Sequence, residues 1–232
     1  MKNSILVTGA DRGLGLAFVE HYLQQGNNVI ATSRRQPIGD ALQNLQQLYQ
    51  DKLTVYFVDL TDELSINHFA EQLAPLNIAL DIVINNAGIS VEQSLGNWKT
   101  ENFIQHFMVN SIAPMLMAQA VLPYMNANSK LVQISSGVGS AQWNIGTEKG
   151  LDAYAASKGA LNILSRRLSA KVADKNIIVS LLNPGWVQTD MGGSAATTTI
   201  EQATLQMTHT IAQLSLKHSG LFIEADGTLI PW

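Results

Sequence analysis

Short apolar segments alternate with longer amphipathic segments along the whole chain. The apolar segments predict strands near 4–8, 28–32, 54–58, 82–85, 130–135, 178–183 and 220–223. The segments between them predict helices, the longest of which lie near 100–122 and 152–172. Strands that alternate regularly with helices pack into a doubly wound α/β fold, so we expect a mostly parallel sheet of seven strands.

A glycine-rich turn follows the first predicted strand. The apolar run Ser4–Thr8 leads directly into Gly9-Ala10-Asp11-Arg12-Gly13-Leu14-Gly15, and an amphipathic helix comes next. A strand, a glycine-rich turn and a helix N-terminus together bind dinucleotides, because small residues let the backbone approach the pyrophosphate. The spacing differs from the usual G-x-G-x-x-G, so the glycines alone could also form a tight turn that binds no ligand.

Tyr154 and Lys158 lie four residues apart in a predicted helix. Helical positions i and i+4 share a face, so the phenol and the ammonium can reach one pocket. A phenol has a pKa of about 10 and is a poor acid–base catalyst at neutral pH unless its anion is stabilised, which a nearby ammonium can do. The pair alone fits a solvated helix face equally well.

Together these features resemble the short-chain dehydrogenase/reductase family over essentially the whole chain. Its glycine motif stands at Thr8–Gly15, its Asn-Asn-Ala-Gly motif at Asn85–Gly88, and its Pro-Gly turn within Asn183–Asp190. The run 135–140, the stretch 184–193 and the ending 223–232 resemble the C-factor and sniffer carbonyl reductases within the family. The resemblance implies a catalytic set of Asn110, Ser136, Tyr154 and Lys158, with Ser135 as the alternative serine.

The end of the second predicted strand indicates which dinucleotide would bind. NAD sites of this design place an acidic residue there for the ribose 2′-hydroxyl, but this strand runs into Ser33-Arg34-Arg35 without a carboxylate. A guanidinium would instead pair with a 2′-phosphate, and Arg12 lies near the same place in family members. We therefore predict NADPH over NADH, with solvated loop charges at Arg34 and Arg35 as the alternative.

The resemblance also implies a set of cofactor contacts from six motifs. These residues are Gly9, Asp11, Arg12, Gly13, Leu14, Gly15, Ser33, Arg34, Asp59, Leu60, Asn86, Ala87, Gly88, Tyr154, Lys158, Pro184, Gly185, Val187 and Thr189. In the family, the position of Asp59 holds the adenine amine and that of Thr189 binds the nicotinamide carboxamide. Asn110 would hold a water that links Lys158 to solvent.

These assignments lead to an NADPH-dependent reductase of aldehydes or ketones. Tyr154 would donate a proton to the carbonyl oxygen, and Ser136 would hydrogen-bond the same oxygen and stabilise its developing charge. The alternative is a dinucleotide-binding signalling or scaffold protein with little turnover, which has no need for the catalytic set. A methyltransferase would share the glycine turn but has no reason to contain Tyr154 and Lys158.

Composition narrows the remaining choices. A chain of 232 residues fits one α/β domain, residues 1–232, with no room for a separate substrate domain. The absence of cysteine excludes disulfides and sulfur-ligated zinc. Five histidines, at 21, 68, 106, 209 and 218, show no metal-ligand spacing, and we expect them on helix surfaces or in loops. We therefore predict no metal.

Charge and hydropathy indicate where the protein acts. The net charge is −4, and no basic stretch suggests a nucleic-acid partner. The first predicted strand begins almost at the N-terminus, and no apolar run approaches the roughly 18–20 residues that span a membrane. We expect a cytoplasmic protein without a membrane partner. Family relatives commonly associate through the helices near 100–122 and 152–172, which implies a homodimer or homotetramer.

Overall fold

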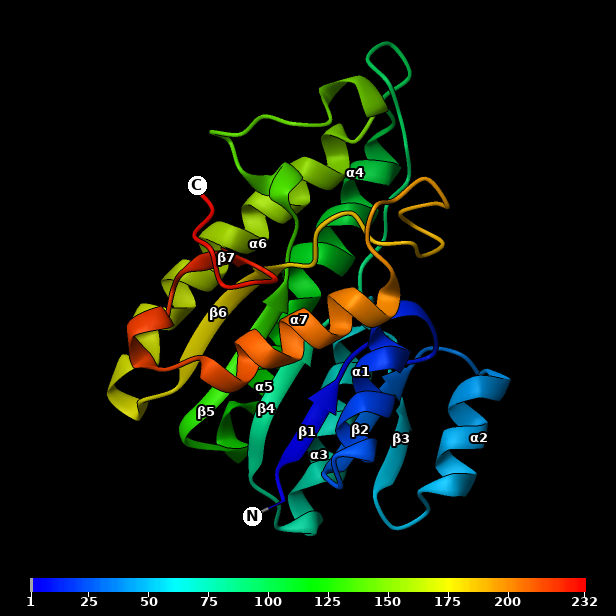
Figure 1. The fold of residues 1–232 in the computed structure, drawn as a ribbon, viewed down its shortest axis with the longest axis vertical. Coiled ribbons are helices and arrows are strands. Elements are labelled where there is room, and N and C mark those ends of the chain that lie inside the picture. Colours follow the sequence, from blue (N-terminus) through cyan, green and yellow to red (C-terminus); the bar gives the residue numbers. More distant parts are fainter. Residues whose placement is uncertain (1) are drawn as a thin grey trace.

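Seven parallel strands form one sheet in the computed structural model, which describes residues 2–232 (Figure 1). The strands are β1 (Ser4–Val7), β2 (Asn28–Ser33), β3 (Leu53–Phe57), β4 (Leu80–Asn85), β5 (Met125–Ile134), β6 (Ile178–Asn183) and β7 (Phe222–Glu224). Their order is β3-β2-β1-β4-β5-β6-β7. The predicted fold class is confirmed, with every strand pairing parallel. The order reverses between β1 and β4, and ligands of such sheets bind at the carboxyl ends of the strands at this point.

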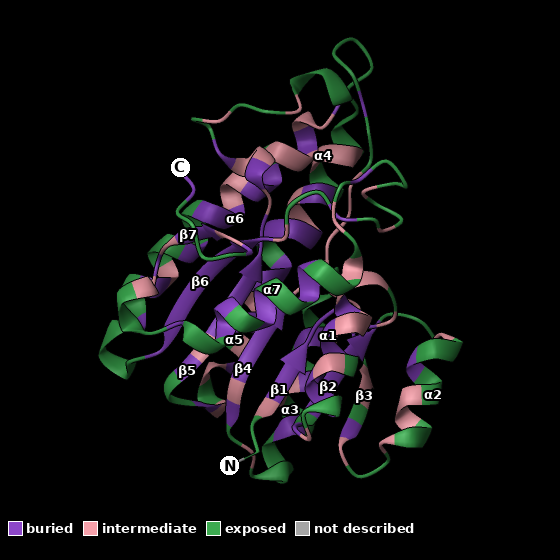
Figure 2. Cartoon of the chain, in the orientation of Figure 1, coloured by how far each residue is buried: buried purple, intermediate pink, exposed green. Residues whose placement is uncertain are grey.

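Helices cover both faces of the sheet (Figure 1). One face packs against α1 (Gly13–Gln24), α2 (Asp40–Leu48) and α7 (Ile200–Gln213). The other packs against α3 (Glu63–Leu73), α5 (Ala113–Val121) and α6 (Asp152–Lys171), and α4 (Thr100–Phe107) contacts α6. The central strands are buried, the edge strand β3 is mostly half-buried or exposed, and the outer helix surfaces are exposed (Figure 2).

Burial on both faces explains why the strands are apolar without alternation. Successive strand residues point to opposite faces, so Ile5 and Val7 join the core beneath α1 and α7, whereas Leu6 joins the core beneath α3 and α5. Phe18 and Phe69, one on each side, have no exposed surface. A parallel sheet covered on both faces reads as continuous apolar runs.

The helix predicted near 100–122 is divided into two. α4 ends at Phe107 and α5 begins at Ala113, and a turn of π-helix, Met108–Ile112, lies between them. Such wider turns often occur at functional sites. The whole stretch Thr100–Tyr124 is long and apolar enough to cross a membrane by length and composition, contrary to the expectation from sequence. Its apolar character has another explanation, since 44% of its most apolar window is buried inside the fold.

Candidate active site

The ends of β1 and β4 are tied together by the two motifs that follow them. The Thr8 hydroxyl accepts hydrogen bonds from the backbone N–H groups of Asn86 at 3.1 Å and Ala87 at 3.2 Å. Asn86 Nδ2 donates to the carbonyls of Thr8 at 3.0 Å and Gly9 at 3.2 Å. A side chain at Gly9, where φ is +65°, would meet Ala87 at 2.9 Å, and one at Gly15 would collide with the Gly9 carbonyl. The two motifs therefore form one backbone cradle at the start of α1, where an anion is favoured.

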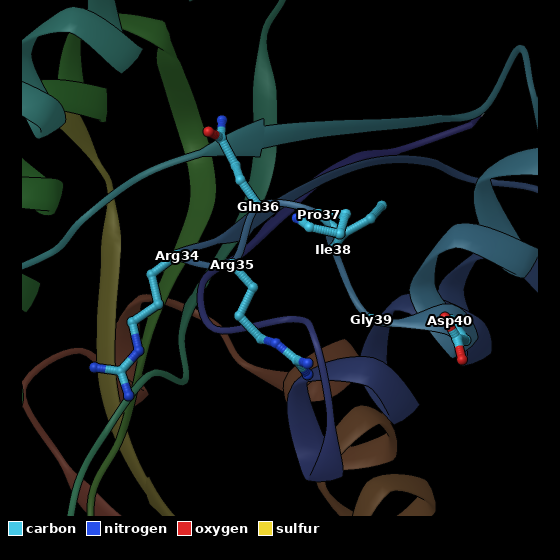
Figure 3. Close-up of a pocket in the computed structure, with 7 residues that line it drawn as sticks. All are labelled: Arg34, Arg35, Gln36, Pro37, Ile38, Gly39 and Asp40. Atoms are coloured by element: carbon cyan, nitrogen blue, oxygen red, sulfur yellow. The ribbon is translucent and has the colours of Figure 1, made fainter.

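Arg34 and Arg35, in the loop after β2, have different surroundings. Arg35 Nη1 donates to Asp11 Oδ2 at 2.9 Å, and the Gly39 backbone N–H donates to Asp11 Oδ1 at 2.7 Å. Figure 3 shows the Arg35 side chain reaching toward the start of α1 while Arg34 points away from it. Within residues 2–232, Arg34 makes no ion pair with a carboxylate. Residues 34–40 line a cavity of about 610 Å³, so Arg34 is the cation of this loop that is available to an anion.

Asp59 and Leu60 follow β3 on the same edge of the sheet. Asp59 Oδ1 accepts hydrogen bonds from the Thr61 hydroxyl at 2.7 Å and backbone N–H at 2.9 Å. These bonds lower the pKa of Asp59, and the positive charge of Arg34 adds to the effect. The ionised Asp59 carboxylate therefore lies close enough to the Arg34 guanidinium to be affected by its charge.

The Arg12 side chain is paired with a carboxylate of another loop. Its Nη1 forms an ion pair with Asp190 Oδ2 at 2.5 Å, and both side chains are about three-quarters exposed. Thr189, beside Asp190, lies close to the glycine turn, because a side chain at Gly13 would be 3.7 Å from Thr189 Cγ2. Arg12 therefore links the glycine turn to the loop of Pro184, Gly185 and Val187, and such an exposed pair contributes little to stability.

The two adjacent serines after β5 have separate partners. Ser135 is buried, and its hydroxyl donates to Asn162 Oδ1 at 2.6 Å. Asn162 Nδ2 in turn donates to the Gly139 carbonyl at 3.2 Å. Ser136 is partly exposed and lies close enough to the Tyr154 phenol to lower its pKa. Ser135 and Asn162 thus hold the loop, while Ser136 faces the phenol.

Tyr154 and Lys158 share one face of α6. Lys158 Nζ lies 5.7 Å from the Tyr154 ring centroid and donates to the Ile134 carbonyl at 2.8 Å. Burial raises the pKa of Tyr154 to about 12, against the lowering effect of the nearby Ser136 side chain. Burial also lowers the pKa of Lys158 to about 8. Burial of Tyr154 therefore opposes the phenolate form that the Lys158 ammonium is expected to favour. The phenol stays protonated at neutral pH, which is the form that a general acid requires.

Asn110, in the π-helical turn, is fully buried. Its Oδ1 accepts from the Ile89 N–H at 2.8 Å, and its Nδ2 donates to the Ile89 carbonyl at 2.9 Å and to Ser157 Oγ at 3.0 Å. A side chain at Gly88 would lie 3.3 Å from Asn110 Oδ1 and 3.6 Å from Lys158 Nζ, so glycine keeps this approach open. Both amide hydrogens of Asn110 are used, so its side chain has no donor left for a further ligand.

The chain matches the short chain dehydrogenase family over residues 3–199. This protein belongs to the short chain dehydrogenase family. It is similar to C-signal of Myxococcus xanthus, with 35% identity over 156 residues that cover 66% of this chain and 93% of C-signal. Among solved structures it is similar to the NADPH-bound carbonyl reductase from chicken fatty liver (TM-score 0.92, 33% identity). It is also similar to the carbonyl reductase Sniffer of D. melanogaster (TM-score 0.93, 29% identity).

Both structural similarities cover 100% of each chain. The short-chain dehydrogenase therefore has the fold of these carbonyl reductases along its whole length, and it is an oxidoreductase. Its similarity to the sniffer-type reductases confirms the resemblance noted from the motifs.

His106, near the centre of this short-chain dehydrogenase, was missed by the sequence analysis. We expected the histidines at surfaces or in loops, but His106 has no exposed surface. Its ring centroid lies 6.4 Å from that of Tyr154, with the rings at 69°. A lone histidine in a helix carries no functional signal. The available clue was its spacing of four residues from both Asn102 and Asn110. Among residues 2–232, no group of histidines and carboxylates could hold a metal ion.

Two loops meet at the rim of the short-chain dehydrogenase site. Lys149 Nζ lies 4.3 Å from the Trp186 ring centroid, and Trp186 Nε1 donates to the Gly192 carbonyl at 2.8 Å. Trp186 and Met191 are exposed, so either side chain could contact a substrate. Trp143 instead packs against a small core cluster that includes Leu161, which favours a packing role.

Proposed function

We propose that this short-chain dehydrogenase reduces the carbonyl group of a small or medium aldehyde or ketone to an alcohol, using NADPH. The observation that carries the proposal is that the Tyr154 phenol lies beside Ser136 and that Lys158 Nζ lies 5.7 Å from the Tyr154 ring centroid. A binding protein needs none of these three groups together. The similarity to carbonyl reductases, one of them NADPH-bound, supports the same reaction.

The residues present fit a dinucleotide phosphate. Gly9 and Gly15 leave no space for a side chain, which is what close approach of a pyrophosphate to the backbone requires. Arg34 is free for charge-assisted hydrogen bonds to a 2′-phosphate. Asp59 and Leu60 would border the adenine, and Val187 and Thr189 the nicotinamide. When bound, the reduced nicotinamide supplies the hydride.

Each catalytic residue then has one task. Tyr154 Oη donates its proton to the carbonyl oxygen as the carbonyl carbon is reduced, and accepts a proton in the reverse direction. Ser136 Oγ hydrogen-bonds the same oxygen and stabilises its growing charge. Lys158, held by the Ile134 carbonyl, orients the ribose and stabilises the phenolate that remains. Asn110 fixes the backbone of Ile89, next to the Gly88 position that approaches Lys158 Nζ, and would hold the water that links Lys158 to solvent.

Arg34→Ala is expected to raise the KM for NADPH by about tenfold to a hundredfold, because a charged hydrogen bond contributes about 1.5–3 kcal/mol. The KM for NADH should change less than about twofold. Arg35→Ala is the matched control: it removes the neighbouring cation, which is already paired with Asp11, and should change the KM for NADPH by less than about threefold. Steady-state kinetics with both cofactors measure the three values. Equal effects of the two substitutions, or equal losses with NADH, would contradict the assignment of Arg34.

A signalling or scaffold role with little turnover is the second candidate, because the protein is similar to one named C-signal. Hydride transfer separates the two functions. A carbonyl reductase transfers deuterium from labelled NADPH to the carbonyl carbon of its substrate, whereas a binding protein does not.

We further propose that residues 1–232 act as one cytoplasmic domain that forms a homodimer or homotetramer without nucleic-acid or membrane partners. Exposed isoleucines on the helices that mediate association in family relatives support the oligomer. Ile104 on α4 is 58% exposed, Ile112 is 40% exposed, and Ile163 on α6 is 63% exposed. Light scattering during gel filtration measures the mass directly.

A further inference from the structure

One face of the helical segment beginning with α4 holds the chain that follows the Asn-Asn-Ala-Gly motif. Asn110 binds both backbone groups of Ile89, at 2.8 and 2.9 Å. His106 Nε2 accepts from the Val91 N–H at 3.0 Å. Asn102 Nδ2 donates to Gln93 Oε1 at 3.2 Å. The helical residues are spaced by four and the chain residues by two, so the three polar contacts lie in a row between two segments that run in opposite directions.

The two spacings match physically. Four α-helical residues, as from Asn102 to His106, rise about 6.0 Å, and two residues of extended chain advance about 6.6 Å. Residues 102, 106 and 110 therefore meet residues 93, 91 and 89 in order, and we call this set of contacts the α4 ladder. The far end is also fixed, since the Gln93 N–H donates to the Gly150 carbonyl at 2.9 Å. Gly150 lies just before α6, the helix that carries Tyr154.

His106 is the central contact of the α4 ladder and has only one consistent protonation state. The Val91 N–H is a donor, so Nε2 must carry a lone pair. The proton of the neutral ring then lies on Nδ1, which donates to the Asn102 carbonyl at 2.6 Å. Both nitrogens are thereby satisfied in a side chain with no exposed surface. The same ring meets Tyr154 edge-on, with centroids 6.4 Å apart.

We propose that His106 is a positioning residue, which as a neutral Nδ1–H imidazole aligns the Tyr154 ring and the segment 89–93 for the reaction. The inference rests on the proposed function, because Tyr154 must be the acid for its alignment to matter. His106 moves no proton itself, since both of its nitrogens are occupied. It acts through the Val91 backbone on one side and the Tyr154 ring on the other.

Two substitutions separate this role from simple packing. His106→Phe keeps a ring against Tyr154 but leaves the Val91 N–H without its acceptor. His106→Gln can place an amide oxygen near the position of Nε2 and so restore that hydrogen bond. His68→Phe, on the exposed surface of α3, is the matched control. We expect kcat to fall about tenfold in His106→Phe, because small misplacements of reacting groups are costly, and to recover to within about threefold of wild type in His106→Gln.

The experiment measures kcat, carbonyl KM and NADPH Kd for wild type and these three variants. The NADPH Kd should stay within about twofold throughout, because His106 contacts none of the proposed cofactor residues except Tyr154. Nitrogen-15 NMR of histidine-labelled wild type reports the tautomer without any substitution, and the expected signal is Nδ1–H for the buried ring. An Nε2–H ring, or a folded His106→Phe with wild-type kcat, would overturn the proposal. If wild type binds NADPH but reduces no carbonyl, the proposed function fails instead, whatever the tautomer.

Discussion

Tyr154→Phe is expected to lower kcat/KM for carbonyl reduction by about a hundredfold to ten-thousandfold, the usual contribution of a positioned general acid. The substitution removes only the phenol oxygen and keeps the ring that packs against His106. Because the Tyr154 phenol is the group proposed to protonate the carbonyl oxygen, that oxygen would then have to take its proton from water or a less well placed donor. The NADPH Kd should change less than about threefold, since Lys158 and the glycine cradle are untouched. Steady-state NADPH oxidation and fluorescence titration measure the two effects separately.

The pH profile gives a second view of the same pair. Burial raises the pKa of Tyr154 to about 12, so its proton is present throughout the neutral range. Burial lowers the pKa of Lys158 to about 8, so the ammonium loses its proton as the pH rises through that value. The kcat/KM for carbonyl reduction should therefore be level at about pH 6–7 and decline above about pH 8.

For the Tyr154→Phe variant, a kcat/KM equal to that of wild type would show that another group is the acid.

Ser136→Ala is expected to lower kcat/KM by about a hundredfold to a thousandfold, the effect of removing one donor to a developing oxyanion. The adjacent Ser135→Ala is the matched control. It should leave kcat/KM within about threefold but lower the free energy of unfolding by about 1–3 kcal/mol, because Asn162 Oδ1 loses its buried donor. Kinetics and chemical denaturation of both variants make the comparison.

The two serines thus separate catalysis from stability. If Ser135→Ala showed the larger loss of kcat/KM, the assignment of the catalytic serine would be wrong. If both variants lost activity equally while folding normally, the loop after β5 would act as a unit and the roles could not be divided.

The fold was largely predictable because the sheet is buried on both faces. Each of the seven strands was predicted from a short apolar run, such as the one at residues 82–85. The helices predicted between the strands indicated that the strands run parallel. The division of the helix near 100–122 was not predictable, because a single π-helical turn at Met108–Ile112 leaves no clear break in periodicity. Asn110 lies in this π-helical turn, so the part of the fold that the sequence did not predict belongs to the candidate active site.

Within the site, the sequence predicted contacts between residues a few positions apart, but it did not predict contacts between residues far apart in the chain. The positions of Tyr154 and Lys158 on one face of α6 followed from the helical repeat. No spacing rule could predict that Arg12 pairs with Asp190, 178 residues away. Nor could the sequence show that burial raises the pKa of Tyr154, since desolvation depends on neighbours from distant segments. His106 was missed for the same reason.

Transfer of deuterium from NADPH labelled at C4 of the nicotinamide tests the central claim most directly. Wild type would be incubated with each C4-labelled epimer and a panel of aldehydes, ketones and quinones, and the alcohol products would be analysed by mass spectrometry. The account predicts an alcohol that gains one deuterium at the former carbonyl carbon from one epimer only. It also predicts loss of this product in Tyr154→Phe. Tight NADPH binding without deuterium in any product would contradict it and favour the signalling or scaffold role.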